Sequence, residues 1–273
     1  MGQDPCGAAD PYTRPVNEVP FVGGNISNAV RVGDTVRRNT GPWTPTVHAL
    51  LRHLEAARFP GAPRVLGIDE RGREILSYID GDAPTGWPDP YPAWIWGTEA
   101  LVSAARLLRA YHDAIATFVP PADAVWRQPA PPADVGDRDI VCHNDVGQFN
   151  TVFRDERAFA MIDWDQIAPG PRAWDIAIAL YRWVPVTATP SGEVAESQGT
   201  RIRRFCEAYG HADVEEVVDL LPVRMRHGYE YARERAAAGE PGFVKIWGFS
   251  DGLAYVLRDI EHAERDRDAL LRG

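Results

Sequence analysis

The most informative segment of the chain is His143-Asn144-Asp145-Val-Gly-Gln-Phe-Asn150, which is followed by Ile162-Asp163-Trp164-Asp165. Between these segments lie two short β-type runs, 151–154 and 158–162, which predict a hairpin. Because a hairpin returns the chain, we expect Asp145, Asn150 and Asp163 to face one pocket. Asp and Asn are common in turns, but this spacing within a β-type context favours a functional site.

The three side chains are the groups that nucleotide-dependent phosphoryl transfer uses. Asp145 is expected to act as the general base for a hydroxyl group. Asn150 and Asp163 offer the oxygen ligands that Mg²⁺ prefers. Asp165 is either a second metal or supporting ligand or a helix-entry cap, and both alternatives stay open. His143 is expected to fix the loop by hydrogen bonding.

Upstream of this stretch, residues 20–80 show a strand, helix and strand pattern. A tight Gly33-Asp34 turn between the runs 28–32 and 35–38 predicts a β-hairpin. Thr44-Pro45 opens a helix to about Arg58, with its apolar residues on one face. Two further strands are expected at 64–68 and 74–79, on either side of a polar turn.

Downstream of Gly81 the pattern becomes mainly helical. The periodicity predicts helices over 98–116, 173–183, 200–209, 214–238 and 247–271. The expected fold is therefore α+β and bilobal, with a loose N-terminal tail (1–19), a small antiparallel β lobe with one helix (20–80) and a larger helical lobe (81–273).

Composition narrows the function classes. Residues 81–200 carry 16 acidic and 8 basic side chains, and hold nearly all of the net charge of −10. This acidity disfavours nucleic acid as a partner and mildly favours metal ions and cationic ligands. The sequence has no signal-type segment, no apolar run of membrane-spanning length and three scattered cysteines, which indicate a reduced, cytoplasmic protein with no membrane partner.

Several of these segments resemble the aminoglycoside phosphotransferase family, whose fold is protein-kinase-like. The resemblance spans about residues 20–265 and is carried by Val22-Gly-Gly-Asn25, Ala62-Pro-Arg-Val-Leu66, Tyr111-His112, His143-x-Asp145-x4-Asn150, Ile162-Asp163-Trp164-Asp165 and Gly170-Pro-Arg-Ala-Trp-Asp175-Ile-Ala. It implies a small-molecule kinase that uses ATP or GTP and Mg²⁺, and that acts as a monomer or homodimer.

The resemblance also implies roles for individual residues. Asp145 would be the catalytic base, Asn150 and Asp163 the magnesium ligands, and Asp175 a structural support of the catalytic loop. The strand that contains Ser77 and Ile79 would offer backbone contacts to the purine. The turn with Gly23, Gly24 and Asn25 would cover the phosphates, since glycine permits close backbone approach.

The chain departs from the family at the lysine that holds the α- and β-phosphates, because its one lysine is Lys245. We expect Arg37 to take over this contact, with Arg38 on the opposite face of the strand as the fallback. The family pairs this lysine with a glutamate of the following helix. Alignment on Ala62-Pro-Arg-Val-Leu66 places Val47 or His48 at the glutamate position, whereas the spacing from Arg37 would allow Glu55.

Only twelve residues separate Asp163 from Asp175, too few for the long activation segment of a protein kinase. A small hydroxylated molecule, aminoglycoside-like or another antibiotic, is therefore the expected acceptor. Two alternatives are a housekeeping kinase for choline, an amino alcohol or a sugar, and a nucleotide-binding regulator without activity. Acidic and aromatic side chains are candidate acceptor contacts: Trp164, Glu230, Glu234, Trp247 and Asp251, with Tyr229, Tyr255 and Glu261 as weaker candidates.

Overall fold

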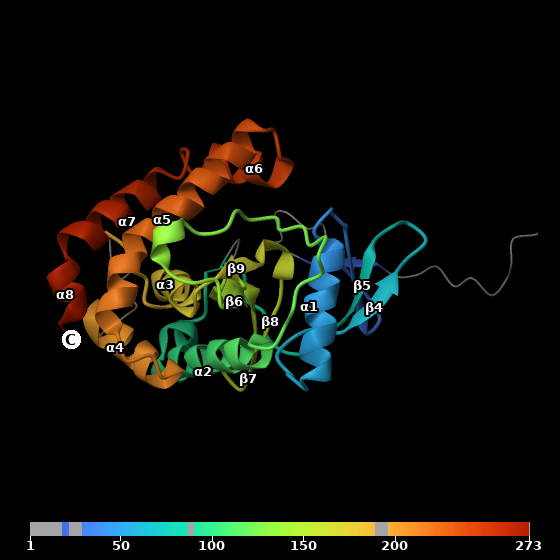
Figure 1. The fold of residues 1–273 in the computed structure, drawn as a ribbon, viewed down its shortest axis with the longest axis horizontal. Coiled ribbons are helices and arrows are strands. Elements are labelled where there is room, and N and C mark those ends of the chain that lie inside the picture. The colour runs from blue at the N-terminus through green and yellow to red at the C-terminus, as the bar shows by residue number, and fades with distance from the viewer. Residues whose placement is uncertain (1–17, 22–28, 87–89, 189–195, 273) are drawn as a thin grey trace, which may run out of the picture.

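An antiparallel sheet forms the N-terminal part of the chain in the computed structural model, which describes residues 18–21, 29–86, 90–188 and 196–272 (Figure 1). Its strands have the spatial order β1-β2-β3-β5-β4. They are β1 (Val19–Pro20), β2 (Val30–Val32), β3 (Thr35–Arg38), β4 (Val65–Ile68) and β5 (Glu74–Ser77). Both predicted hairpins are confirmed, because β2 pairs with β3 and β4 with β5.

The register of the central strands decides which side chains face the rest of the molecule. Arg37 lies opposite Ile75 and Arg38 opposite Glu74. Since successive side chains of a strand point to opposite faces, the two arginines cannot serve the same site. The turn into β3 uses Gly33 at φ +58°, a conformation that glycine adopts without steric cost.

One helix, α1 (Thr44–Ala56), follows the first hairpin. Pro45 stands in its first turn, where a missing N–H costs no helical hydrogen bond. Leu50, Leu51 and Leu54 are fully buried and recur at the spacing of one helix face. The predicted helix is confirmed, and it ends two residues earlier than expected.

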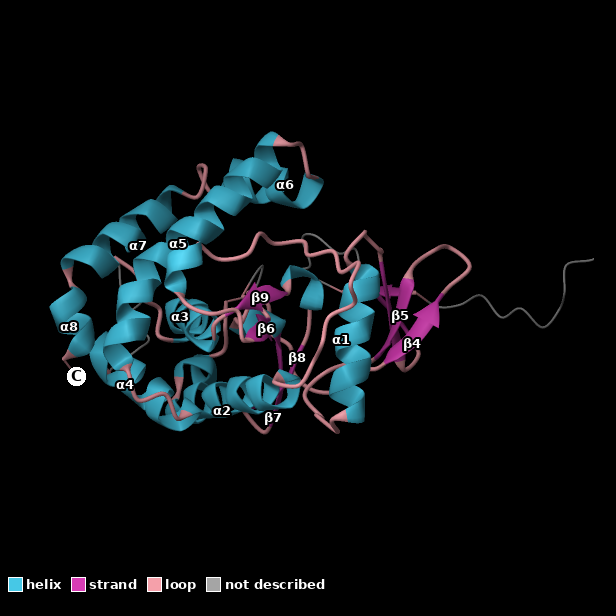
Figure 2. Cartoon of the chain, in the orientation of Figure 1, coloured by secondary structure: helices cyan, strands magenta, loops and turns pink. Residues whose placement is uncertain are grey.

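The remaining helices form the larger part of the molecule, to the left of α1 in Figures 1 and 2. They are α2 (Thr98–Ile115), α3 (Arg172–Trp183), α4 (Gln198–Tyr209), α5 (Val214–Ala237), α6 (Pro241–Phe249), α7 (Ala254–Arg265) and α8 (Arg267–Leu271). Helix α5 packs against α3, α6 and α7, so it is central to this part. None of the described helices is long and apolar enough to cross a bilayer.

The prediction of one continuous helix over 247–271 is wrong. Helix α6 begins at Pro241, six residues before the expected start, and the chain then breaks twice. At the first break Asp251, Gly252 and Leu253 all have positive φ, which a right-handed helix cannot contain. A helical apolar pattern continues through the break, so periodicity alone did not reveal it.

Two short antiparallel ladders of two strands each lie between the sheet and the helices (Figure 2). The predicted pair β7 (Thr151–Arg154) and β8 (Arg157–Met161) is confirmed. The other ladder joins β6 (Ile140–Cys142) to β9 (Ala168–Gly170), a strand that the sequence did not reveal. It holds the segment before His143 next to the segment after Asp165. The α+β fold with a small antiparallel sheet and a larger helical part is therefore confirmed, while the division into lobes at residue 80 stays a prediction.

Candidate active site

The loop after β6 is fixed by one buried carboxylate. Asp175, in the first turn of α3, accepts hydrogen bonds from the backbone N–H of His143 (2.6 Å) and of Asn144 (2.7 Å). A third contact comes from His112 Nε2 at 3.1 Å. Burial raises the pKa of Asp175, but the contacts with His112 and the loop outweigh it, so the pKa is lowered overall. This placement matches the supporting position expected for Asp175.

His143 was expected to fix the loop by hydrogen bonding, but neither of its ring nitrogens has a hydrogen-bond partner within the described structure. It is fully buried, and its ring packs against the Trp164 indole with 4.6 Å between ring centroids. Burial lowers the pKa of His143. The His143 ring therefore packs behind the loop, and it does not line the cavity.

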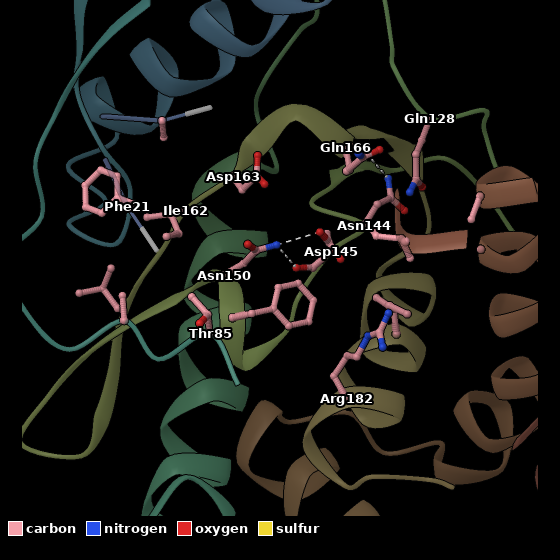
Figure 3. A pocket seen from close by; sticks show the side chains of 18 of the residues that line it. Phe21, Thr85, Gln128, Asn144, Asp145, Asn150, Ile162, Asp163, Gln166 and Arg182 are labelled. Atoms are coloured by element: carbon pink, nitrogen blue, oxygen red, sulfur yellow. Dashed lines mark hydrogen bonds between the residues drawn. The ribbon is translucent and has the colours of Figure 1, made fainter. Parts of the chain in front are cut away.

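Asp145 lines a cavity of about 570 Å³ that also includes Asn150 and Asp163 (Figure 3). The Asn150 amide nitrogen donates to the Asp145 carboxylate at 2.8 Å and to its backbone carbonyl at 3.0 Å. Burial raises the pKa of Asp145, and the neighbouring Arg182 opposes this. A carboxylate with a raised pKa is a better proton acceptor than an ordinary one.

The structure thus brings together the three residues that the sequence singled out. Asn150 turns its amide oxygen away from Asp145, and the Asn150 carbonyl accepts the N–H of Ile162, beside Asp163 (2.9 Å). Asp163 has the left-handed φ of 61°. The amide and carboxylate oxygens fit Mg²⁺, which takes few protein ligands and completes its shell with phosphate and water. Within the described ranges, no cluster of three His, Cys, Asp or Glu side chains offers an alternative metal site.

Arg38, and not Arg37, faces this cavity. The Arg38 guanidinium lies 3.2 Å from Asp163, 2.7 Å from Asp165 and 3.2 Å from Glu74. Burial lowers the pKa of Arg38, but the carboxylates outweigh it and raise the pKa overall. Arg37 instead lies 3.7 Å from Asp69 and donates to the Thr35 hydroxyl. The expectation for Arg37 is corrected, and the reason is the alternation of strand side chains.

The acidic partner of Arg38 is Glu74, a residue that the sequence reasoning missed. Glu74 is buried, and His48 of α1 lies 2.9 Å from its other carboxylate oxygen. The expected partner Glu55 is half exposed and lies 3.8 Å from Arg64, on another surface. The missed signal was the register of the two hairpins, which sets Glu74 directly opposite Arg38.

Asp165 is held between two arginines, Arg38 and Arg127, the second at 3.3 Å. Arg127 also pairs with Glu240, just before α6, and its guanidinium lies over the Trp43 ring. Burial raises the pKa of Asp165. Asp165 lies within the short turn of helix Trp164–Gln166, whose N-cap is Asp163. Its observed contacts are therefore ion pairs that tie the sheet to the helices.

One end of the cavity, here called the sheet end, is formed by residues of β3 and β5 and by the two residues that follow β5. They are Val36, Leu76, Ser77, Tyr78 and Ile79. Ser77 exchanges backbone and hydroxyl hydrogen bonds with Arg64, which fixes this edge. Both predicted purine contacts, Ser77 and Ile79, line the cavity. Gly23, Gly24 and Asn25 lie outside the described residues.

The candidate acceptor contacts are not where they were expected. Trp164 is a core residue, 1% exposed, and its indole N–H donates to the Met161 carbonyl. Glu230 pairs with Arg233 on the surface, and Glu234 is exposed. Trp247 packs against Tyr229, and Asp251 lies in the exposed break after α6. None of these five side chains, nor Glu261, lines the cavity.

Helix rotation explains the difference. The cavity is lined by Arg224, Gly228 and Tyr231 of α5, which recur at the spacing of one helix face. Glu230 and Glu234 belong to a different face. The other end of the cavity, here called the helical end, comprises Tyr181, Arg182, Arg224, Tyr229 and Tyr255, with apolar neighbours. Of these, Tyr229 and Tyr255 were among the weaker sequence candidates, and the two arginines were missed.

Comparison with known proteins places this geometry in context. The sequence profile of the phosphotransferase enzyme family matches residues 82–214. The trifolitoxin immunity protein of Rhizobium leguminosarum bv. trifolii is 33% identical over 249 residues, which are 86% of this chain and 91% of that protein.

Solved structures with the same fold have lower sequence identity. A choline/ethanolamine kinase family protein from Mesorhizobium loti matches with a TM-score of 0.61 and 16% identity, over 96% of this chain and 94% of that chain. Amicoumacin kinase, in complex with AMP-PNP, Ca²⁺ and Ami, matches with a TM-score of 0.60 and 12% identity, over 93% of this chain and 89% of that chain. Aminoglycoside 2'-phosphotransferase-IIIa in its GDP complex gives 0.59 and 12%, over 92% and 94%.

Proposed function

Because the chain belongs to the phosphotransferase enzyme family, we propose that it transfers the γ-phosphoryl group of ATP or GTP, with Mg²⁺, to a hydroxyl group of a small molecule. The observation that carries this proposal is the meeting of Asp145, Asn150 and Asp163 in one cavity between the sheet and the helices. The AMP-PNP and GDP complexes of proteins with this fold support a nucleotide as phosphoryl donor.

In the proposed reaction the acceptor hydroxyl lies against Asp145, which takes its proton as the oxygen attacks the γ-phosphorus. The bond from that phosphorus to the β–γ bridging oxygen breaks, and the nucleoside diphosphate leaves. Bound through Asn150 and Asp163, Mg²⁺ would neutralise charge on the phosphates. Asp145 is half-buried, and the partial loss of solvent around it would strengthen its hydrogen bond to the hydroxyl group.

Arg38 would hold the phosphates from the sheet side. Its guanidinium is fixed by Glu74, which is itself fixed by His48, so the group is preorganised before the nucleotide arrives. A planar guanidinium can present two parallel N–H donors to two phosphate oxygens, a fixed geometry that the lysine ammonium group lacks. Upon nucleotide binding, Arg38 would exchange Asp163 for phosphate and keep Glu74.

We propose an antibiotic or toxin as the acceptor class. The support is the identity of 33% to a protein named for immunity to trifolitoxin, over most of both chains. The alternative acceptor is a metabolite such as choline or an amino alcohol. Its support is the fold shared with the choline/ethanolamine kinase family protein, at 16% identity. A nucleotide-binding regulator without activity would not need a catalytic base (Asp145), two metal ligands (Asn150 and Asp163) and an open cavity together.

The experiment is a screen of hydroxylated antibiotics and metabolites with ATP or GTP and Mg²⁺, read by the mass gain of one phosphoryl group. Asp145→Asn serves as the inactive control. A product that forms with the wild type and disappears with the variant supports the proposal. Slow Mg²⁺-dependent nucleotide hydrolysis without any acceptor, lost in Asp163→Asn, would already exclude the silent regulator.

A further inference from the structure

The helical end of the cavity is positively charged, whereas an acceptor with several cationic groups would need negative charge there. Two guanidinium groups, those of Arg182 and Arg224, line it. Among the described residues that line the whole cavity, the acidic ones are Asp145 and Asp163, which the proposed reaction already uses. An acceptor that carries several ammonium groups would meet two cations there and no spare carboxylate.

Arg224 is a buried cation whose charge no described carboxylate neutralises directly. Its side chain is 1% exposed, and its Nη2 donates to the Asn144 carbonyl at 2.7 Å. Its guanidinium lies 5.0 Å from the centre of the Trp174 ring, while its Nε has no hydrogen-bond partner within the described structure. Burial lowers the pKa of Arg224 to about 10. Burying an unpaired charge is costly, and an anionic ligand would offset that cost.

Arg182 lies on the Asp145 side of the same end (Figure 3). Its guanidinium contacts the Tyr181 ring (4.9 Å) and the Phe149 ring (5.6 Å), and its buried Nε has no hydrogen-bond partner in the part of the chain that is described. Arg182 and Asp145 line the same cavity, so the cation is on the side of the proposed acceptor hydroxyl.

We infer that the acceptor carries a carboxylate a short distance from the hydroxyl that is phosphorylated, and that Arg182 and Arg224 bind this carboxylate. The inference rests on the proposed function. The surrounding Tyr229, Tyr255 and Met225 favour an aromatic or apolar body attached to it. Arginine binds carboxylates through two parallel hydrogen bonds, which suits the free donors of both side chains. The acceptor class is thus an apolar hydroxy acid, and not an aminoglycoside or choline.

The test uses three probes that share a phenyl ring and a primary hydroxyl group two carbons from a nitrogen: N-benzoyl-L-serine, its neutral amide N-benzoyl-L-serinamide, and the cation N-benzylethanolamine. Binding is measured by calorimetry on the full chain with Mg²⁺ and a non-hydrolysable ATP analogue. We expect the carboxylate to bind at least about tenfold more tightly than the amide, as a charged hydrogen bond implies.

Arg182→Met should bring the carboxylate-to-amide ratio close to one, and Arg182→Lys should restore part of it. Arg224→Met should act in the same direction if it folds, since Arg224 also holds the Asn144 carbonyl. Arg226→Met is the matched control, because Arg226 lies on the exposed side of α5 and pairs with Glu264. It should leave the ratio unchanged.

The inference is overturned if no carboxylate probe binds, if the amide or the cation binds as tightly as the carboxylate, or if Arg182→Met keeps the wild-type ratio. The last result would assign Arg182 to the transferred phosphoryl group. Nucleotide binding without any probe is measured separately. If Mg²⁺-linked nucleotide binding is absent in the wild type, the proposed function itself fails; if it is present while the cation is preferred, only this inference fails.

Discussion

Arg38 and Asp163 form an ion pair of 3.2 Å across the cavity. The first residue belongs to the sheet and the second to the segment after β8, so the pair joins the two sides of the proposed nucleotide site. The proposed phosphate-binding cation and the proposed metal-binding carboxylate are thus paired with each other here. A nucleotide with its metal ion would supply each with a new partner of opposite charge.

Removal of Arg38 should weaken nucleotide binding and the fold together. We expect Arg38→Met to raise the nucleotide Kd by about tenfold or more, because a charged contact to phosphate is lost. It should also lower the free energy of unfolding by about 3 kcal/mol, since the buried Glu74 loses its arginine and keeps only His48. Calorimetry and urea unfolding measure the two effects. Arg37→Met, on the opposite face, should change the nucleotide Kd little; an equal loss in that control would contradict the assignment.

Removal of the base should affect turnover and spare nucleotide binding. Asp145→Asn keeps the shape of the side chain and its contact with Asn150, but it cannot accept the hydroxyl proton. We expect kcat to fall by about 10²- to 10⁴-fold. The nucleotide Kd should stay near its wild-type value. Asp155→Asn, in the exposed turn between β7 and β8, is the matched control, because Asn tolerates the positive φ found there.

We expect Asp163 to bind the metal ion and Asp165 to stabilise the fold. Asp163→Asn is expected to abolish the effect of Mg²⁺ on nucleotide binding. Asp165→Asn should leave the Mg²⁺ dependence unchanged and lower the free energy of unfolding by about 3 kcal/mol, because Arg38 and Arg127 lose their shared carboxylate. Magnesium titrations of nucleotide binding and urea unfolding distinguish them. A shifted Mg²⁺ dependence in Asp165→Asn would instead make Asp165 a metal ligand.

Stability should decrease on mild acidification. Burial lowers the pKa of both His112 and His143 in the folded chain. Below about pH 6.5, the ordinary histidine value, the unfolded chain binds protons that the folded chain does not. The free energy of unfolding should then fall by up to about 1.4 kcal/mol per pH unit for each histidine, until the pH reaches the lowered pKa. Urea unfolding between about pH 7 and about pH 5 measures this slope, and His143→Gln should reduce it. An unchanged slope in that variant would show that His143 is not the titrating group.

The meeting of the three site residues could be predicted from sequence because its signal is local. Asp145, Asn150 and Asp163 are tied by one loop and one hairpin, so their meeting depends on short-range geometry. The helices over 98–115 and 172–183 were found for a related reason, since each has one apolar face. The breaks at 250–253 and 266 were not found, because backbone angles there change without interrupting the apolar pattern.

What the sequence alone determined is which reactive groups are present and which neighbours along the chain they need. Tertiary structure decided which arginine faces the cavity and which side of α5 lines it. Arg37 and Arg38 are adjacent in sequence, and only the pairing of β3 with β5 and the packing of α1 assign one to the site. Helix α5 carries both acids and arginines, and its rotation against α3 and α7 turns Arg224 inward and Glu234 outward. Those orientations arise from contacts between residues far apart in the chain, which a local pattern does not contain.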